Sequence, residues 1–146
     1  MNRKHIEVLL VEDNPYDAKL TIRALKKAGL EKHLYTVKDG EQALDFVFSE
    51  GKYASRRHEK PLRLILLDLK LPKINGLEVL EKIKSDDRSK SIPVVVLTSS
   101  DHDKDILKSY SFGANSYIVK PVELDDFIYT VEKIGLYFLE LNRTLH

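Results

Sequence analysis

Short apolar runs rich in Val, Ile and Leu recur along the chain, and segments with helical periodicity lie between them. Several of these runs are continuously apolar, which is typical of strands that are covered on both faces of a sheet. They occupy residues 6–11, 33–37, 64–67, 93–97 and 116–119. The pattern predicts five strands, each followed by a helix.

The segments between the runs contain recognisable helix boundaries. Asn14 is suited to the N-cap of a first helix, Pro15 to its first position and Gly29 to its end. Asp39 and Gln42 open a second helix in the manner of a capping box. Apolar periodicity predicts three more helices, around residues 77–84, around residues 106–112 and from Leu124 onward.

Regular alternation of strand and helix predicts an α/β domain of the (βα)5 type. Its parallel sheet is doubly wound, and with five strands we expect the flavodoxin-like strand order 2-1-3-4-5. In that order the chain reverses direction between strands 1 and 3, and ligands bind beyond the carboxyl ends of those strands. The polar stretch at residues 51–63, GKYASRRHEKPLR, shows no periodicity. We expect it to be an exposed loop.

Composition narrows the class of protein. The chain has 146 residues, with 24 Lys and Arg against 23 Asp and Glu and no Cys. The length fits one domain, and the nearly equal numbers of basic and acidic residues do not favour direct nucleic-acid binding. The absence of Cys excludes disulfides and thiolate zinc sites. No apolar run is long enough to cross a membrane, and the start MNRKHIEV does not resemble a secretion signal. We therefore expect a cytoplasmic protein.

Carboxylates follow two of the predicted strands. Glu12 and Asp13 come after the first strand, and Asp68 comes after the third. These strands are neighbours in the expected order, so the three acids converge and repel one another unless a cation lies between them. Oxygen ligands with room for water and a phosphoryl group favour Mg²⁺.

The fourth and fifth strands end in Thr98 and Lys120. A hydroxyl and an ammonium beside a divalent ion form a pocket suited to a phosphoryl group. Asp68 is the best candidate for the group that is phosphorylated, because a carboxylate can attack phosphorus when a metal reduces the charge repulsion.

These residues lie in segments that resemble the consecutive signature blocks of response-regulator receiver domains. The blocks are LLVEDNPYDA, VKDGEQALDF, LILLDLKLPKINGLEVL, IPVVVLTSS and GANSYIVKPV. By position, the resemblance implies that Asp68 is the phosphoacceptor, Thr98 the switch hydroxyl and Lys120 the phosphate-binding lysine. It implies an Mg²⁺ site formed by Glu12, Asp13, Asp68 and the main-chain carbonyl of Lys70.

The resemblance carries further implications for switching and partners. It implies that Tyr117 is the switch aromatic and that a cis peptide joins Lys120 to Pro121. It also implies a two-component system, in which a sensor histidine kinase is the phosphate donor. The long segment before the third strand and the block DGEQALDF are also similar to the stand-alone regulators of bacterial phytochrome kinases. Lys70 and Ser100 occupy positions that influence the attacking water in this family, so the dephosphorylation rate is not predictable from the sequence.

The end of the chain predicts an interface. We expect a receiver domain over residues 1–133 and a helical extension over residues 134–146 without an effector domain. One helical stripe can pack on the sheet, and a second stays uncovered. The first contains Ile128, Val131, Ile134, Phe138, Leu141 and Leu145, and the second Tyr129, Leu136 and Leu139. An uncovered apolar stripe favours a homodimer through the fourth helix, fifth strand, fifth helix and extension, the alternative being a helix end that caps its own core.

Two rival functions share the same fold. An Asp-nucleophile phosphatase would carry a second Asp two residues after the nucleophile, where this chain has Lys70. A receiver that never meets phosphate would act as a constitutive adaptor or dimerisation module, yet the acidic pair, the Thr and the Lys are all present. No GxxxxGK or GxGxxG motif supports nucleotide binding. The leading interpretation is a regulatory phosphoacceptor that is not an enzyme acting on external substrates.

Overall fold

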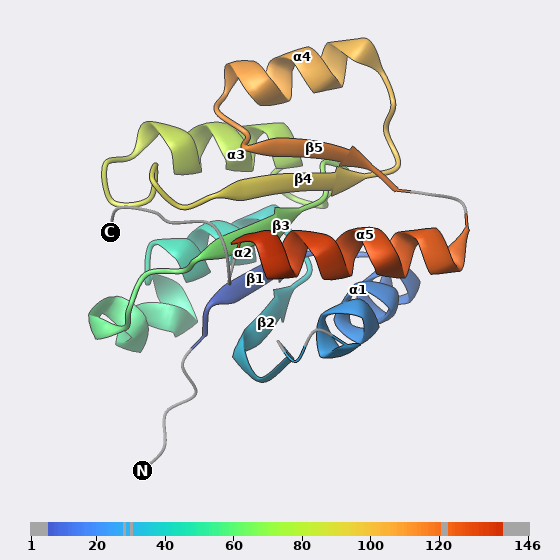
Figure 1. The fold of residues 1–146 in the computed structure, drawn as a ribbon. Coiled ribbons are helices and arrows are strands. Elements are labelled where there is room, and N and C mark those ends of the chain that lie inside the picture. Colours follow the sequence, from blue (N-terminus) through green and yellow to red (C-terminus); the bar gives the residue numbers. More distant parts are fainter. Residues whose placement is uncertain (1–5, 28, 30, 121–122, 139–146) are drawn as a thin grey trace.

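The computed structural model describes residues 6–27, 29, 31–120 and 123–138. Its parallel sheet has the order β2-β1-β3-β4-β5, which confirms the predicted topology (Figure 1). The strands are β1 (Val8–Val11), β2 (Leu34–Val37), β3 (Leu64–Leu67), β4 (Val94–Thr98) and β5 (Ser116–Val119).

Helices cover both faces of the sheet. Helices α1 and α5 lie on one face and α2 and α3 on the other, while α4 lies beside β5 (Figure 1). Their bounds are α1 (Pro15–Lys27), α2 (Gly40–Val47), α3 (Gly76–Ser85), α4 (Asp103–Ser111) and α5 (Leu124–Leu136). Two short 3₁₀ helices, η1 (Glu31–His33) and η2 (Gly51–His58), complete the described elements.

Strand β1 explains why the apolar runs are continuous. Val8 and Leu10 pack against α1 and α5, whereas Leu9 and Val11 face the opposite layer. Successive side chains of a strand point to opposite faces, so a strand between two helical layers must be apolar at every position.

Local side-chain bonds fix the helix starts. Asn14 Oδ1 accepts from the amides of Tyr16 at 2.9 Å and Asp17 at 3.1 Å, as expected of an N-cap. Asp39 accepts from the amide of Gln42 at 2.7 Å at the start of α2. Helix α4 begins at Asp103, three residues before the predicted start, because the carbonyl of His102 already accepts the first helical bonds.

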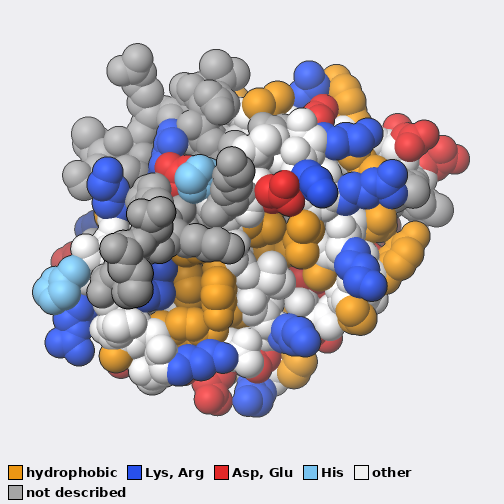
Figure 2. All heavy atoms as spheres, turned by 90° about the horizontal axis from the view of Figure 1, so that it is seen from below, with side chains coloured by type: hydrophobic (Ala, Val, Ile, Leu, Met, Phe, Trp, Pro, Cys, Tyr) orange, Lys and Arg blue, Asp and Glu red, His pale blue; other side chains and the backbone are white. Residues whose placement is uncertain are grey.

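The prediction of an exposed loop over residues 51–63 is wrong in part. Residues Gly51–His58 form η2, and Tyr53 is only 7% exposed. Its ring packs edge-on against Phe46, with the centroids 5.0 Å apart, and its hydroxyl lies 3.1 Å from the hydroxyl of Tyr35. Figure 2 looks onto the β2 side of the sheet and shows hydrophobic side chains grouped there between Lys and Arg side chains. Burial of the tyrosine ring offsets the polar character of the segment.

Helix α5 presents the predicted apolar stripe to the core. Ile128, Val131, Ile134 and Phe138 are buried against the sheet and α1, while Tyr129 is 62% exposed. Several predictions lie outside the described residues: the roles of Pro121 and its peptide bond with Lys120, and those of Leu139, Leu141 and Leu145. Within the part of the chain that the structure describes, no helix is both long and apolar enough to span a membrane.

Candidate functional site

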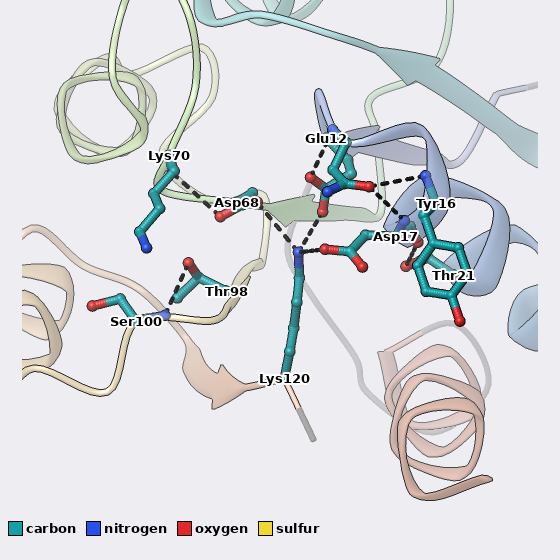
Figure 3. Close-up of polar contacts among 10 residues, drawn as sticks. Glu12, Tyr16, Asp17, Thr21, Asp68, Lys70, Thr98, Ser100 and Lys120 are labelled. Atoms are coloured by element: carbon teal, nitrogen blue, oxygen red, sulfur yellow. Dashed lines mark hydrogen bonds and ion pairs between the residues drawn. The ribbon is translucent and has the colours of Figure 1, made fainter. Parts of the chain in front are cut away.

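Polar residues from four strands meet at the carboxyl edge of the sheet. Val11 pairs with Leu67 in the parallel register, so the residues that follow them, Glu12 and Asp68, are neighbours. Thr98 ends β4, and Lys120 directly follows β5 (Figure 3). The structure therefore brings together the site residues that the sequence placed at separate strand ends.

Glu12, Asp13 and Asp68 form an acidic cluster. Each offers a carboxylate oxygen, and these oxygens all lie within 4.8 Å of one another. Glu12 and Asp68 are buried, whereas Asp13 is exposed and leaves an open side. A cluster of carboxylate oxygens without nitrogen or sulfur ligands is the kind of donor set that suits a hard divalent ion such as Mg²⁺. Family resemblance adds the main-chain carbonyl of Lys70, a role that stays a prediction.

Lys120 neutralises part of this negative charge. Its Nζ lies 2.6 Å from Glu12 Oε1, 2.8 Å from Asp17 Oδ2 and 3.3 Å from Asp68 Oδ2, and its side chain is only 8% exposed. Burial acts to lower the pKa of Lys120, but the hydrogen bonds to Asp17 and Glu12 outweigh it and raise the pKa above its usual value. The lysine is therefore charged at every physiological pH.

The two buried carboxylates have pKa values displaced in opposite directions. Burial, reinforced by the charge of Asp68, raises the pKa of Glu12 to about 7. Burial also acts to raise the pKa of Asp68, but the charge of Lys120 and several hydrogen bonds together lower it below its ordinary value. Asp68 is thus an anion at neutral pH, as a nucleophile must be, while Glu12 is the first of the two to take up a proton as the pH falls.

The loop after β3 shapes the surroundings of Asp68. The amide of Lys70 donates to Asp68 Oδ1 at 3.2 Å, and the exposed Lys70 side chain runs alongside Asp68 in Figure 3. A Cβ at Gly76 would collide with the backbone of Asp68 and Leu69. Only glycine lets the start of α3 approach the phosphoacceptor loop this closely.

Thr98, Ser100 and Tyr117 form a connected set of contacts beside the acids. Thr98 is fully buried, and its Oγ1 accepts from the Ser100 amide at 3.4 Å. The Tyr117 hydroxyl donates to the Ser100 carbonyl at 2.8 Å, and Ser100 Oγ donates to Asp105 at 2.6 Å. The predicted switch hydroxyl and switch aromatic are thus connected through the backbone of one residue.

Sequence reasoning missed the part that Asp17 plays in the site. From the sequence, Asp17 is an ordinary acidic residue in the first turn of a helix, where such residues are favoured. The structure places its carboxylate on Lys120, more than a hundred residues away in the chain. The available signal was its position: Asp17 lies in the first turn of the helix that follows β1, so it is near the carboxyl end of that strand.

Comparison with known proteins identifies, over most of the chain, the same family that the sequence motifs resemble. Residues 8–132 match the family model of the response regulator receiver domain. The probable methanogenesis regulatory protein FilR2 of Methanothrix harundinacea is 44% identical over 138 residues, which cover 94% of this chain and 86% of the relative. Response regulator Rcp1 of Synechocystis sp. is 39% identical over 133 residues, covering 91% and 88%.

Similar proteins have been solved in a phosphorylated form and in a metal-bound form. The phosphorylated cyanobacterial phytochrome response regulator RcpA has a TM-score of 0.89 and 39% identity, covering 97% of this chain and 99% of that one. The Mn²⁺-bound form of Rcp1 has a TM-score of 0.88 and 37% identity, with the same coverage. A protein of the same fold is thus known in a form that binds a divalent ion.

Proposed function

Because the chain belongs to the response regulator receiver domain family, we propose that it accepts a phosphoryl group on Asp68 from a sensor histidine kinase and signals through protein contacts. The single observation that carries this proposal is the convergence on Asp68 of Lys120, Glu12 and Thr98, all buried at one edge of the sheet. Asp68 is the member of this group whose carboxylate has a lowered pKa, and the acid beside it in the cluster, Asp13, is exposed.

The chemistry follows from charge. An oxygen of Asp68 forms a bond to phosphorus while the bond from phosphorus to the donor imidazole nitrogen breaks, and the electron pair of that bond stays on the nitrogen. Lys120 and the hydroxyl of Thr98 are placed to stabilise negative charge on the phosphoryl oxygens. A bound divalent ion, held by Glu12, Asp13 and Asp68, would lower the repulsion between nucleophile and donor.

Phosphorylation changes the charge balance next to Thr98. An aspartyl phosphate carries nearly two negative charges and three acceptor oxygens. We expect Thr98 to move toward these oxygens and Tyr117 to turn inward, which would alter the surface formed by α4, β5 and α5. Such a switch requires only a few kcal/mol between two existing conformations.

Incubation with acetyl phosphate and Mg²⁺ tests the proposal. We expect intact-mass spectrometry to record the mass gain of one phosphoryl group in the wild-type chain, and no gain in Asp68→Asn or when EDTA removes the metal. Asp45→Asn, a change in α2, is the matched control and should react like the wild type. A mass gain that survives Asp68→Asn would assign the wrong acceptor, and no gain in any protein would favour the adaptor function.

The phosphate donor is proposed to be a kinase of phytochrome type. The likeness to RcpA supports this, since RcpA is named as a cyanobacterial phytochrome response regulator and is 39% identical to this chain. Phosphotransfer from purified, radiolabelled histidine kinases is the test. Preferential transfer from a phytochrome kinase over kinases with other sensor domains is expected, and equal or slower transfer would contradict the proposal.

A further inference from the structure

Asp17 is the one carboxylate on Lys120 that the proposed function leaves without a role. Its Oδ2 lies 2.8 Å from Lys120 Nζ, and it projects from the first turn of α1 toward the site (Figure 3). Glu12 and Asp68 also contact the ammonium, but both belong to the acidic cluster that can hold a metal ion. Asp17 lies outside that cluster, so it stays available to Lys120 when a cation occupies the other two.

The position of the Lys120 ammonium indicates that Asp17 and a phosphoryl group on Asp68 would compete for it. Lys120 Nζ is 2.6 Å from Glu12 and 2.8 Å from Asp17 but 3.3 Å from Asp68, so its closer contacts are with residues at the β1–α1 junction and not with the phosphoacceptor. A phosphoryl group on Asp68 adds acceptor oxygens on the opposite side of the same ammonium. An ammonium has three donors on a single centre, and each contact it forms with phosphoryl oxygens is made at the expense of an existing one.

We propose that Asp17 is a positioning residue that holds the Lys120 ammonium on the α1 side while Asp68 is unmodified, and that it competes with the phosphoryl oxygens for this charge. Asp17 thereby lowers the stability of the phosphorylated state relative to the unmodified one. The inference rests on the proposed function, because it requires Asp68 to be the phosphoacceptor. It needs no movement of the backbone, since Lys120 has a long side chain with several rotatable bonds.

Beryllofluoride, which mimics a phosphoryl group on aspartate, is the probe for this competition. At saturating Mg²⁺, we expect Asp17→Asn to bind beryllofluoride about two- to fivefold more tightly than the wild type, the range expected when one competing ion pair is lost. Titration followed by ¹⁹F NMR measures the affinity. Asp17→Glu keeps the charge and should bind like the wild type.

Asp103→Asn is the matched control, because Asp103 is an exposed aspartate in the first turn of α4. It removes the same charge without removing a contact of Lys120, so its affinity should stay near the wild-type value. Repeating the titrations at high salt separates the contact from long-range charge effects, which salt screens. A structural role for Asp17 alone would leave the affinity of Asp17→Asn unchanged or weaken it.

A second readout follows the lysine directly. We expect the ¹⁵Nζ signal of Lys120 to be protected from exchange in the wild type and in Asp103→Asn, and to weaken in Asp17→Asn. The inference is overturned if Asp17→Asn binds beryllofluoride no more tightly than Asp103→Asn while both fold. Failure of the wild type itself to bind beryllofluoride with Mg²⁺ would instead overturn the proposed function.

Discussion

At the scale of single residues, the site depends on two adjacent carboxylates that titrate differently. Glu12 is 3% exposed and has its pKa raised to about 7 by burial and by the neighbouring Asp68, while the pKa of Asp68 is lowered mainly through Lys120. One proton on Glu12 relieves the repulsion in the absence of a cation. A divalent ion that uses Glu12 as a ligand must displace this proton.

The affinity for Mg²⁺ should therefore depend on pH. A proton and a cation compete for Glu12, so affinity is high above pH 7 and falls as the pH drops below the pKa of about 7. The expected slope is about tenfold per pH unit well below that pKa for one displaced proton. Calorimetric titration of Mg²⁺ between pH 5.5 and 8.5 measures it.

Glu12→Gln is the control for this dependence. Glutamine cannot be protonated in this range, so we expect weaker binding with a flatter pH profile. A wild-type affinity that stays constant across the range would show that Glu12 does not exchange a proton for the metal.

At the scale of elements, η2 is part of the hydrophobic core despite its polar sequence. Tyr53 packs on Phe46 and Tyr35, and the Arg56 guanidinium lies 3.8 Å from the centroid of the Phe46 ring. Burial and the hydrogen bond with Tyr35 raise the pKa of Tyr53, which keeps its hydroxyl protonated. The segment therefore anchors the β2 edge of the sheet through one aromatic cluster.

Tyr53→Ala tests this anchoring. Removing a buried aromatic ring leaves a cavity, and we expect the free energy of unfolding to fall by about 3 kcal/mol. Urea denaturation followed by circular dichroism measures the change. Ser55→Ala, at an exposed position of the same helix, should change the stability by less than about 0.5 kcal/mol. Equal effects of the two substitutions would show that residues 51–58 behave as an exposed loop and that Tyr53 does not anchor them.

At the scale of the whole molecule, exposed apolar side chains gather on α4, β5 and α5. Leu107 is 70% exposed and Tyr110 50% on α4, Val119 is 39% exposed on β5, and Tyr129 is 62% exposed on α5. Helix α4 lies directly beside β5 (Figure 1). Apolar groups spread over adjacent elements are typical of a protein interface, and they are consistent with the homodimer that the sequence predicts.

Leu107→Asp should lower the dimer fraction. A charge at the centre of an apolar interface would be buried without a partner on association, so we expect at least a tenfold weaker dimer. Light scattering coupled to size-exclusion chromatography measures the mass across a concentration series, with and without beryllofluoride. Lys52→Ala, far from this surface, is the control. An undiminished dimer in Leu107→Asp would place the interface elsewhere.

Much of the fold was predictable because local rules and the global topology agree. The runs at residues 64–67 and 116–119 are strands with the predicted bounds, and Asn14 caps α1 as its side-chain chemistry requires. The errors occurred where tertiary contacts decide the outcome. Tyr53 is buried because Phe46 and Tyr35 supply a partner surface, and nothing in the residues next to Tyr53 signals that surface.

The amino-acid sequence by itself determined the strand order and the identity of the acids, the hydroxyl and the lysine at the strand ends, because apolar periodicity and chain order suffice to place parallel strands. Only the tertiary structure decided that Lys120 is shared between Asp17, Glu12 and Asp68, and that Glu12 rather than Asp68 takes up the proton. Distances, burial and charge between residues far apart in the chain set those properties, and they exist only once the sheet has assembled.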